Sequence, residues 1–211
     1  HKELAADESF EVQVLPAWRP DKAMNIEKPE YLDYLETLSK AAGCQIDTFE
    51  DLKNALKKRM DTFEEMGCRA SDHALEHVMY VPETEENLEK IFAKRKQGGI
   101  LTKEEELKFK TAFMAFAAGE YTKRNWAMQL HYGCKRDNNA ARYAQLGPDT
   151  GYDCINNYAP SAQMADFLNA LNEKQSLPKT IIYSLNPNDD EAIGTILGCF
   201  QDAGVAGKIQ Q

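Results

Sequence analysis

The 211 residues carry a formal net charge of −9 at pH 7, and 43% of them are hydrophobic, which is ordinary for a globular protein. The acidic balance argues against binding to nucleic acid or to an anionic membrane, because phosphate groups attract a basic surface. No apolar run approaches the roughly 20 residues that a membrane-spanning helix needs.

The cysteines indicate reduced thiols. They are five in number, no two are spaced as CxxC, and they are Cys44, Cys68, Cys134, Cys154 and Cys199. This pattern predicts neither a disulfide framework nor a structural zinc site. We therefore expect a cytoplasmic protein.

The first half of the chain predicts short strands separated by pairs of helices. The first strand is expected at residues 12–17, and apolar residues at helical spacing follow within residues 29–66. Gly67 ends the second of these helices, and another strand follows at residues 68–71. Two amphipathic helices are then expected within residues 83–124.

The second half continues the alternation. A strand is expected at residues 126–130, followed by a long glycine-containing loop at residues 132–157. A helix at residues 162–173 precedes the next strand, and a helix at residues 190–201 precedes the last strand. The two remaining strands are expected at residues 180–185 and 208–211.

Strands separated by helices are typical of an α/β fold with a parallel sheet. Two architectures agree with this order, a doubly wound open sheet and a partial (β/α)8 TIM-type barrel of about five consecutive βα units with helical insertions. In both, reactive groups belong at the carboxyl ends of the strands. No GxGxxG or GxxxxGK[ST] sequence is present, so a dinucleotide or P-loop site is not indicated.

Polar residues follow the predicted strands where such a site would form. They are Arg19, Asp72, His73, His131, Ser184, Asn186 and Asn188. His131 ends an apolar strand, where a neutral imidazole could bind a metal, relay a proton or serve only a structural purpose. Arg19 could form a guanidinium fork for a carboxylate or stack on Trp18 at the surface.

The histidine spacing alone does not define a metal site. Asp72 and His73 are adjacent, so on a strand only one of them can face a shared interior. His73 and His77 would form an HxxxH pair on a helix, but the pair lacks the glutamate of the HExxH zinc motif. Nothing in the sequence indicates a lowered thiol pKa at Cys134, which we interpret as a packing residue.

Five long blocks carry a resemblance to a known family. They are LPAWRPDKA at 15–23, GCRASDHALE at 67–76, WAMQLHYGCKRDNN at 126–139, LGPDTGYD at 146–153 and LPKTIIYSLNPNDDEAIGTILGCFQ at 177–201. In this order they resemble consecutive blocks of the uronate isomerases, which belong to the amidohydrolase superfamily of metal-dependent (β/α)8 barrels. The resemblance implies that residues 1–211 are an incomplete barrel domain with helical insertions at about 29–66 and 83–124.

The resemblance also implies a reaction. Uronate isomerases interconvert D-glucuronate with D-fructuronate and D-galacturonate with D-tagaturonate, through an enediol and with a divalent metal, usually zinc. It implies that Arg19 binds the substrate carboxylate, that Asp72 and His131 are catalytic, and that His73 is a further pocket residue. His131 would lie close to the metal, and the intact enzyme could be a homo-oligomer.

Part of the family pattern is missing from these residues. The sequence contains no HxH pair, and the family's metal-binding aspartate at the last strand also has no counterpart here. We therefore expect natural sequence on both sides and no catalysis by these residues alone. A metal-dependent hydrolase on a related barrel and a non-catalytic carbohydrate-binding piece of such a barrel remain alternatives.

Overall fold

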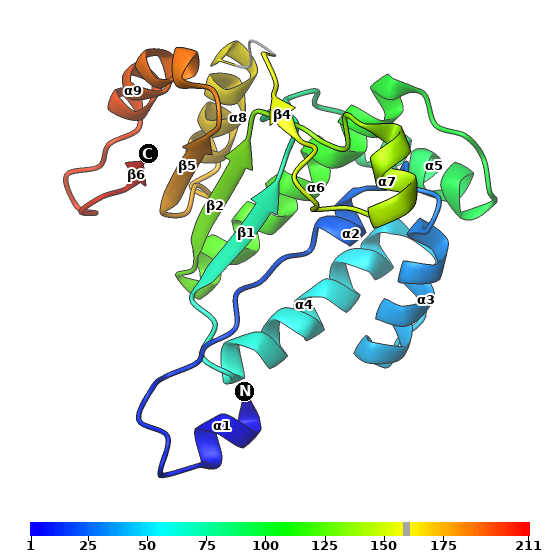
Figure 1. Ribbon diagram of the computed structural model, residues 1–211, viewed down its shortest axis with the longest axis horizontal. Coiled ribbons are helices and arrows are strands. Elements are labelled where there is room, and N and C mark those ends of the chain that lie inside the picture. The colour runs from blue at the N-terminus through cyan, green and yellow to red at the C-terminus, as the bar shows by residue number, and fades with distance from the viewer. Residues whose placement is uncertain (158–160) are drawn as a thin grey trace.

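The computed structural model describes residues 1–157 and 161–211 (Figure 1). Its helices are α1 (Lys2–Ala6), α2 (Asp21–Met24), α3 (Tyr31–Ala42), α4 (Phe49–Glu65), α5 (Glu85–Lys96), α6 (Lys103–Arg124), α7 (Ala140–Leu146), α8 (Ser161–Glu173), the 3-10 helix η1 (Pro187–Asp189) and α9 (Asp190–Cys199). Its strands are β1 (Ala70–Ala74), β2 (Ala127–Tyr132), β3 (Cys134–Lys135), β4 (Cys154–Ile155), β5 (Thr180–Ser184) and β6 (Ile209–Gln210).

Within the described residues, four strands form a parallel sheet in the order β1-β2-β5-β6. The fold is therefore α/β with a parallel sheet, as the alternation of strands and helices predicted. The strand expected at residues 12–17 does not form, and Val12 and Leu15 are 65% and 50% exposed. Instead, Trp18 alone makes a parallel bridge to Ser71, which places Arg19 at the open side of β1.

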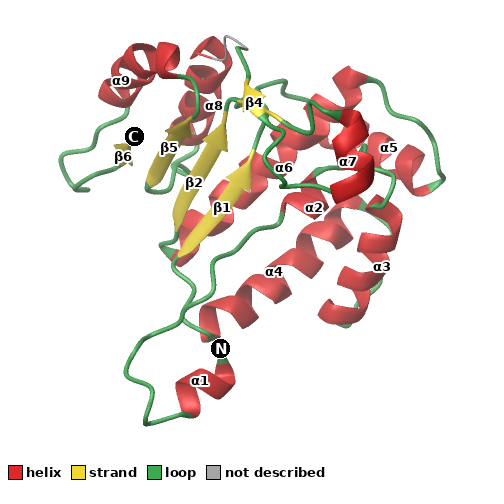
Figure 2. Cartoon of the chain, viewed as in Figure 1, coloured by secondary structure: helices red, strands yellow, loops and turns green. Residues whose placement is uncertain are grey.

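Helices cover one face of this sheet. In Figure 2 the long helix α6 and helix α8 lie behind the strands; α6 contacts β2, and α8 packs against α6 and α9. Aromatic side chains fill the space between α4, α5 and α6, and the ring centroids of Phe49 and Phe109 are 4.9 Å apart. This packing gives the sheet one buried face and leaves its other face for polar side chains.

The two faces are visible in the burial of β1 and β2. Ser71 and His73 are fully buried beneath β1, whereas Asp72 between them faces the other way. In β2, Leu130 is fully buried and His131 is exposed. Because side chains alternate along a strand, the register that pairs Ala74 with His131 places Asp72 and His131 on the same polar face.

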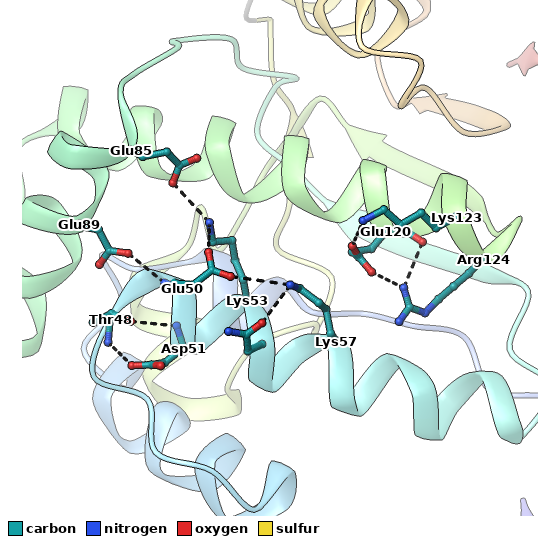
Figure 3. A network of polar contacts seen from close by, with 11 residues as sticks. Thr48, Glu50, Asp51, Lys53, Lys57, Glu85, Glu89, Glu120, Lys123 and Arg124 are labelled. Atoms are coloured by element: carbon teal, nitrogen blue, oxygen red, sulfur yellow. Dashed lines mark hydrogen bonds and ion pairs between the residues drawn. The ribbon is translucent and has the colours of Figure 1, made fainter.

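Capping boxes fix the starts of the two longest helices, α4 and α6. In α4 the Thr48 hydroxyl accepts a hydrogen bond from the Asp51 N–H at 3.0 Å, and the Asp51 carboxylate accepts one from the Thr48 N–H at 2.9 Å (Figure 3). The start of α4 is also tied to α5, because the Glu89 carboxylate accepts hydrogen bonds from the N–H groups of Phe49 and Glu50. These bonds satisfy backbone donors that a helix start leaves unpaired.

The end of α6 carries a charge cluster of its own. Glu120, which is almost fully buried, accepts hydrogen bonds from Lys123 and Arg124 (Figure 3). Burial alone would raise the pKa of the Glu120 carboxyl, but its bonds to Lys123 and Arg124 outweigh burial and lower it. The cluster keeps a buried carboxylate charged at the point where α6 gives way to β2.

The long loop expected at residues 132–157 contains regular structure that its sequence did not predict. Strands β3 and β4 pair in antiparallel fashion, and α7 lies between them in the chain. Figure 1 shows β4 next to the carboxyl ends of β1 and β2 and α7 to their right, and Cys134, Arg136 and Asp149 of this loop line the cavity at these strand ends. The loop therefore forms one wall beside the polar side chains at these strand ends. Across the described residues, no helix has the length and apolarity of a membrane span.

Candidate active site

A cavity of about 670 Å³ opens at the carboxyl ends of the strands. Of the four side chains to which the family resemblance gave a role, three line the cavity, namely Arg19, Asp72 and His131. They come from the segment beside β1, from β1 itself and from β2. Parallel strands bring these residues together although more than one hundred positions separate the first from the last.

Asp72 is the centre of this group. Its Oδ2 atom lies 3.0 Å from Arg19 Nη1, and its Oδ1 atom lies 3.0 Å from His131 Nε2. The Asp72 side chain is 22% exposed, against 54% for Arg19 and 48% for His131. A carboxylate between a guanidinium and an imidazole can exchange a proton with the imidazole while the arginine holds its charge.

His131 is held from a second side by an aromatic ring. The rings of His131 and Tyr183 stack with centroids 4.3 Å apart and planes 6° from parallel. Tyr183 lies opposite His131 in the register of β5 and β2, and its hydroxyl donates to the Gln129 side-chain carbonyl at 3.1 Å. The stack fixes the plane of the imidazole and leaves its Nε2 edge toward Asp72.

His73 does not enter the cavity. Its side chain is fully buried on the helix side of the sheet, where Nδ1 lies 3.1 Å from Asp21 Oδ1 and Nε2 lies 2.9 Å from the Tyr121 hydroxyl. The expected place of His73 among the pocket residues is thus corrected, because strand alternation turns it away from Asp72. It also has no second histidine beside it in a metal-binding arrangement, since β1 ends at Ala74 and no helix spans His73 and His77.

Charged residues of α6 line the opposite side of the cavity. The Lys110 ammonium donates to Glu106 at 2.7 Å and to Glu27 at 3.0 Å, and Lys103 donates to Glu106 at 3.0 Å. Burial alone would raise the pKa of Glu106, but the bonds to Lys110 and Lys103 outweigh burial and lower it below its ordinary value of 4.5. This wall is therefore a paired, charged surface at neutral pH.

The loop between β2 and α8 adds a further cation to the cavity wall. Arg136 lines the cavity and pairs with Asp149 and Asp153, each at 3.0 Å. Cys134 lies beside it, and burial raises the pKa of its thiol above the ordinary value of 9.0. The thiol stays protonated at neutral pH, which agrees with its interpretation as a packing residue.

Of the three polar residues named at the end of the fourth predicted strand, Ser184 lines the cavity, whereas Asn186 and Asn188 do not. Ser184 lines the cavity, and its hydroxyl donates to the Asn186 carbonyl at 3.0 Å. Asn186 is buried, and its amide group donates to Asn157 at 3.2 Å while its side-chain oxygen accepts from the Asn188 N–H at 3.2 Å. Asn186 and Asn188 thus build the turn after β5 and contribute less to the cavity than expected.

All 211 residues match the family model described as glucuronate isomerase. This chain belongs to the glucuronate isomerase family. Its curated relatives include uronate isomerases of Lachnospira eligens and Lachnoclostridium phytofermentans, which are 66% and 61% identical to it over 211 residues. The chain spans 45% of the length of each of these relatives.

Solved structures of the glucuronate isomerase family have the same fold. A crystal structure of uronate isomerase from Thermotoga maritima matches 96% of this chain with a TM-score of 0.87 at 32% identity. A crystal structure of glucuronate isomerase from Caulobacter crescentus matches 89% with a TM-score of 0.78 at 21% identity, which speaks for the fold alone. The chain covers 43% and 39% of those two chains.

The resemblance to the glucuronate isomerases implies a divalent metal ion, so we asked whether the described side chains provide enough ligands for one. Catalytic zinc needs about three protein ligands. Among residues 1–157 and 161–211 no three histidine, cysteine, aspartate or glutamate side chains are grouped to hold a metal ion. Asp72 Oδ1 is buried and accepts no hydrogen bond within the described residues, and it lies 3.0 Å from His131 Nε2. Asp72 and His131 could together offer a metal ion two ligands, which is fewer than it needs. These residues do not form a metal site by themselves.

Several residues of this candidate site were given no role from the sequence. Tyr183 stacks on His131, Asp21 bonds to Arg19, and Arg136 lines the loop wall. Two of them had a usable signal, since Asp21 closes the WRPD block and Tyr183 lies one residue before Ser184 at a strand end. Arg136 had none, because its place depends on a loop whose path the sequence does not fix.

Proposed function

We propose that this chain is the middle and later part of a uronate isomerase, and that residues 1–211 form one incomplete (β/α)8 barrel domain. The support is the row of parallel segments from Trp18 through β1, β2, β5 and β6, whose connections are helical. The helical insertions at about 29–66 and 83–124 then correspond to the pairs α3–α4 and α5–α6. Polar residues at the carboxyl ends of such strands are where barrel enzymes have their active sites.

The reaction we propose is the aldose–ketose isomerisation of D-glucuronate to D-fructuronate, and of D-galacturonate to D-tagaturonate. A base takes the proton from C2, the enediol forms, and a proton is returned to C1 while the O2 hydroxyl becomes the ketone. The observation that carries this proposal is the contact of Asp72 with both Arg19 and His131 in one cavity. It offers a carboxylate-binding cation beside two groups that can transfer protons.

Arg19 is the residue that we assign to the substrate carboxylate. Its Nε and Nη1 atoms face Asp21 and Asp72, while its Nη2 atom has no hydrogen bond or ion pair within the described part of the chain. The side chain is about half exposed into the cavity, so the Nη2 edge is available to a ligand. Asp72 and His131 are assigned acid–base roles at the reacting carbons.

A divalent metal ion, zinc, belongs to the proposal for the intact enzyme, where it would polarise the substrate oxygens. His131 is the residue of this chain that would lie nearest to it, and the remaining ligands must come from the rest of the enzyme. We also propose a cytoplasmic, homo-oligomeric enzyme whose partner is a small hexuronate, with nucleic acid and membranes playing no part. The family relationship supports the hexuronate partner, and the acidic composition argues against nucleic acid and anionic membranes.

The test uses the full-length enzyme that contains these residues, loaded with zinc and incubated separately with D-glucuronate and with D-galacturonate in D2O. The expected result is D-fructuronate, detected by proton NMR, with turnover reduced by roughly a hundredfold or more in Asp72→Asn and His131→Asn. A full-length enzyme that leaves both hexuronates unchanged would disprove the proposal. Hydrolysis of an amide or ester substrate by the same preparation would instead favour a hydrolase.

A further inference from the structure

A chain of hydrogen bonds beneath the cavity links Arg19 to helix α6. The Asp21 Oδ2 atom accepts from Arg19 Nε at 3.4 Å and from the Ala74 N–H at 2.9 Å. The other carboxylate oxygen, Oδ1, lies 3.1 Å from His73 Nδ1. His73 Nε2 then lies 2.9 Å from the hydroxyl of Tyr121, which α6 carries.

This chain of hydrogen bonds is shielded from water at the end formed by His73 and Tyr121. His73 and Tyr121 are fully buried, and the Asp21 side chain is 12% exposed. Because these side chains are buried, water cannot replace their hydrogen-bond partners. A buried network whose members are all bonded is rigid, because breaking any one bond leaves a polar atom unpaired.

The partners determine which way the protons point. The distances fit the tautomer in which His73 Nδ1–H donates to the Asp21 carboxylate and His73 Nε2 accepts from the Tyr121 hydroxyl. Burial raises the pKa of Tyr121 well above its ordinary value, and the hydroxyl therefore keeps the proton that it donates. In this tautomer each donor of the hydrogen-bond chain points toward Asp21, to which Arg19 donates its Nε–H from the other side.

The consequence for Arg19 is a guanidinium held by two carboxylates. Asp21 takes the Nε side and Asp72 takes Nη1, at 3.4 and 3.0 Å. An arginine that is 54% exposed would otherwise sample many rotamers. Both carboxylates line the cavity, but only Asp72 contacts His131, whereas Asp21 is bonded to the buried His73 on the helix side of the sheet.

We propose that Tyr121, His73 and Asp21 form a positioning relay that orients the Arg19 guanidinium for the carboxylate of the substrate. The identity of that carboxylate rests on the proposed function, while the orientation of Arg19 does not. None of the three relay residues is assigned a contact with substrate, so each acts through Arg19. This gives His73 a supporting role in place of the direct pocket contact that its sequence position suggested.

Substitutions in the relay should weaken substrate binding, and they should do so only while Arg19 is present. In the full-length enzyme, Asp21→Asn is expected to raise the KM for D-glucuronate about tenfold with a smaller change in kcat, since a charge-assisted bond to Arg19 is lost. Tyr121→Phe should raise it less. In the Arg19→Met background neither substitution should raise KM further, because coupled residues are not additive.

The matched control is Tyr31→Phe. Tyr31 is also a fully buried tyrosine, and its hydroxyl has no hydrogen bond within the part of the chain that the structure describes. It should leave the KM unchanged. Additive effects of Asp21→Asn and Arg19→Met, or an effect of Tyr31→Phe equal to that of Tyr121→Phe, would overturn the relay and leave a general loss of stability.

A second measurement separates the relay from the proposed reaction. In the full-length protein labelled with 15N-arginine, the Arg19 Nε–H should exchange slowly with water, and Asp21→Asn and Tyr121→Phe should speed that exchange about tenfold while Tyr31→Phe does not. Unchanged exchange in both folded relay variants would disprove the relay. If the wild-type enzyme shows this exchange pattern and yet turns over no hexuronate, the proposed function fails and the relay stands.

Discussion

Asp72 and His73 are consecutive in β1, yet their side chains lie on opposite faces of the sheet and belong to different networks. Asp72 contacts Arg19 and His131 in the cavity, and His73 bonds to Asp21 in the core on the other side. Both networks nevertheless meet at Arg19, which pairs with Asp72 and with Asp21. Substitutions in either network should therefore report on the same arginine.

Arg19→Met in the full-length enzyme should weaken turnover of D-glucuronate far more than turnover of an aldose without a carboxylate. The expected loss in kcat/KM for the uronate is about a hundredfold, because the charge-assisted pair between Arg19 and the substrate carboxylate is removed. The measurement is steady-state kinetics with both substrates on one preparation. Equal losses for the two substrates would remove the carboxylate-binding role of Arg19.

The 211-residue chain alone should not convert D-glucuronate, even with added zinc. Its described residues provide no group of three metal-binding side chains, and Asp72 with His131 leaves the metal incompletely held. Product formation is measured against a blank that contains zinc without protein. Turnover above that blank would show that these residues suffice and would contradict the expectation.

Glu106→Gln should make the stability of the full-length enzyme less dependent on acid pH. Because bonds to Lys110 and Lys103 lower the pKa of Glu106 below 4.5, its carboxylate adds stability above pH 4.5 that is lost as the pH falls through the lowered pKa. The substitution should cost about 1–3 kcal/mol at pH 7 and progressively less toward acid pH. Urea unfolding across this pH range measures the difference.

The control for this pH effect is Glu104→Gln. Glu104 lies in the same first turn of α6 and pairs with Lys108, but its side chain is 71% exposed. An exposed ion pair of this kind contributes about 0–1 kcal/mol. A pH dependence for Glu104→Gln as steep as that for Glu106→Gln would argue against the buried pair as the cause.

Thr48→Ala should destabilise the enzyme by about 1 kcal/mol, because it removes the hydroxyl that caps α4. Thr37→Ala is the matched control, since Thr37 is an equally exposed threonine inside α3 whose hydroxyl bonds only to the Asp33 carbonyl of the same helix. Alanine at that position should be neutral or slightly stabilising. Chemical denaturation of both variants tests the difference, and equal losses would show that the cap is not responsible.

Much of the fold could be predicted from local patterns. Helical periodicity predicted α4 and α6, and the apolar runs at residues 68–71, 126–130 and 180–185 marked β1, β2 and β5. The strand at residues 12–17 was wrong because an alternating apolar pattern forms a strand only where a neighbour pairs with it. Here pairing is limited to Trp18.

The site could be predicted less completely than the fold. Strand ends pointed to Arg19, Asp72 and His131, because carboxyl ends of parallel strands share one edge of the sheet. To predict the face to which the His73 side chain points, the bounds of β1 must be known to one residue, because a shift of one residue turns every side chain to the other face. The sequence does not define these bounds so closely. The roles of Tyr121 and Arg136 depend on how α6 and the loop at residues 132–157 pack, and packing between distant elements leaves no local pattern.

The alternation along β1 has a consequence for how its sequence can vary. Asp72 occupies a position where a replacement changes chemistry while the core remains filled, and His73 occupies one where a replacement disturbs packing and, through Asp21, the arginine above it. Adjacent codons are thus under different selection, one for turnover and one for both turnover and folding. In a saturation library of β1, variants at Asp72 should lose activity while their protein yield stays normal. Variants at His73 should lose both activity and protein yield.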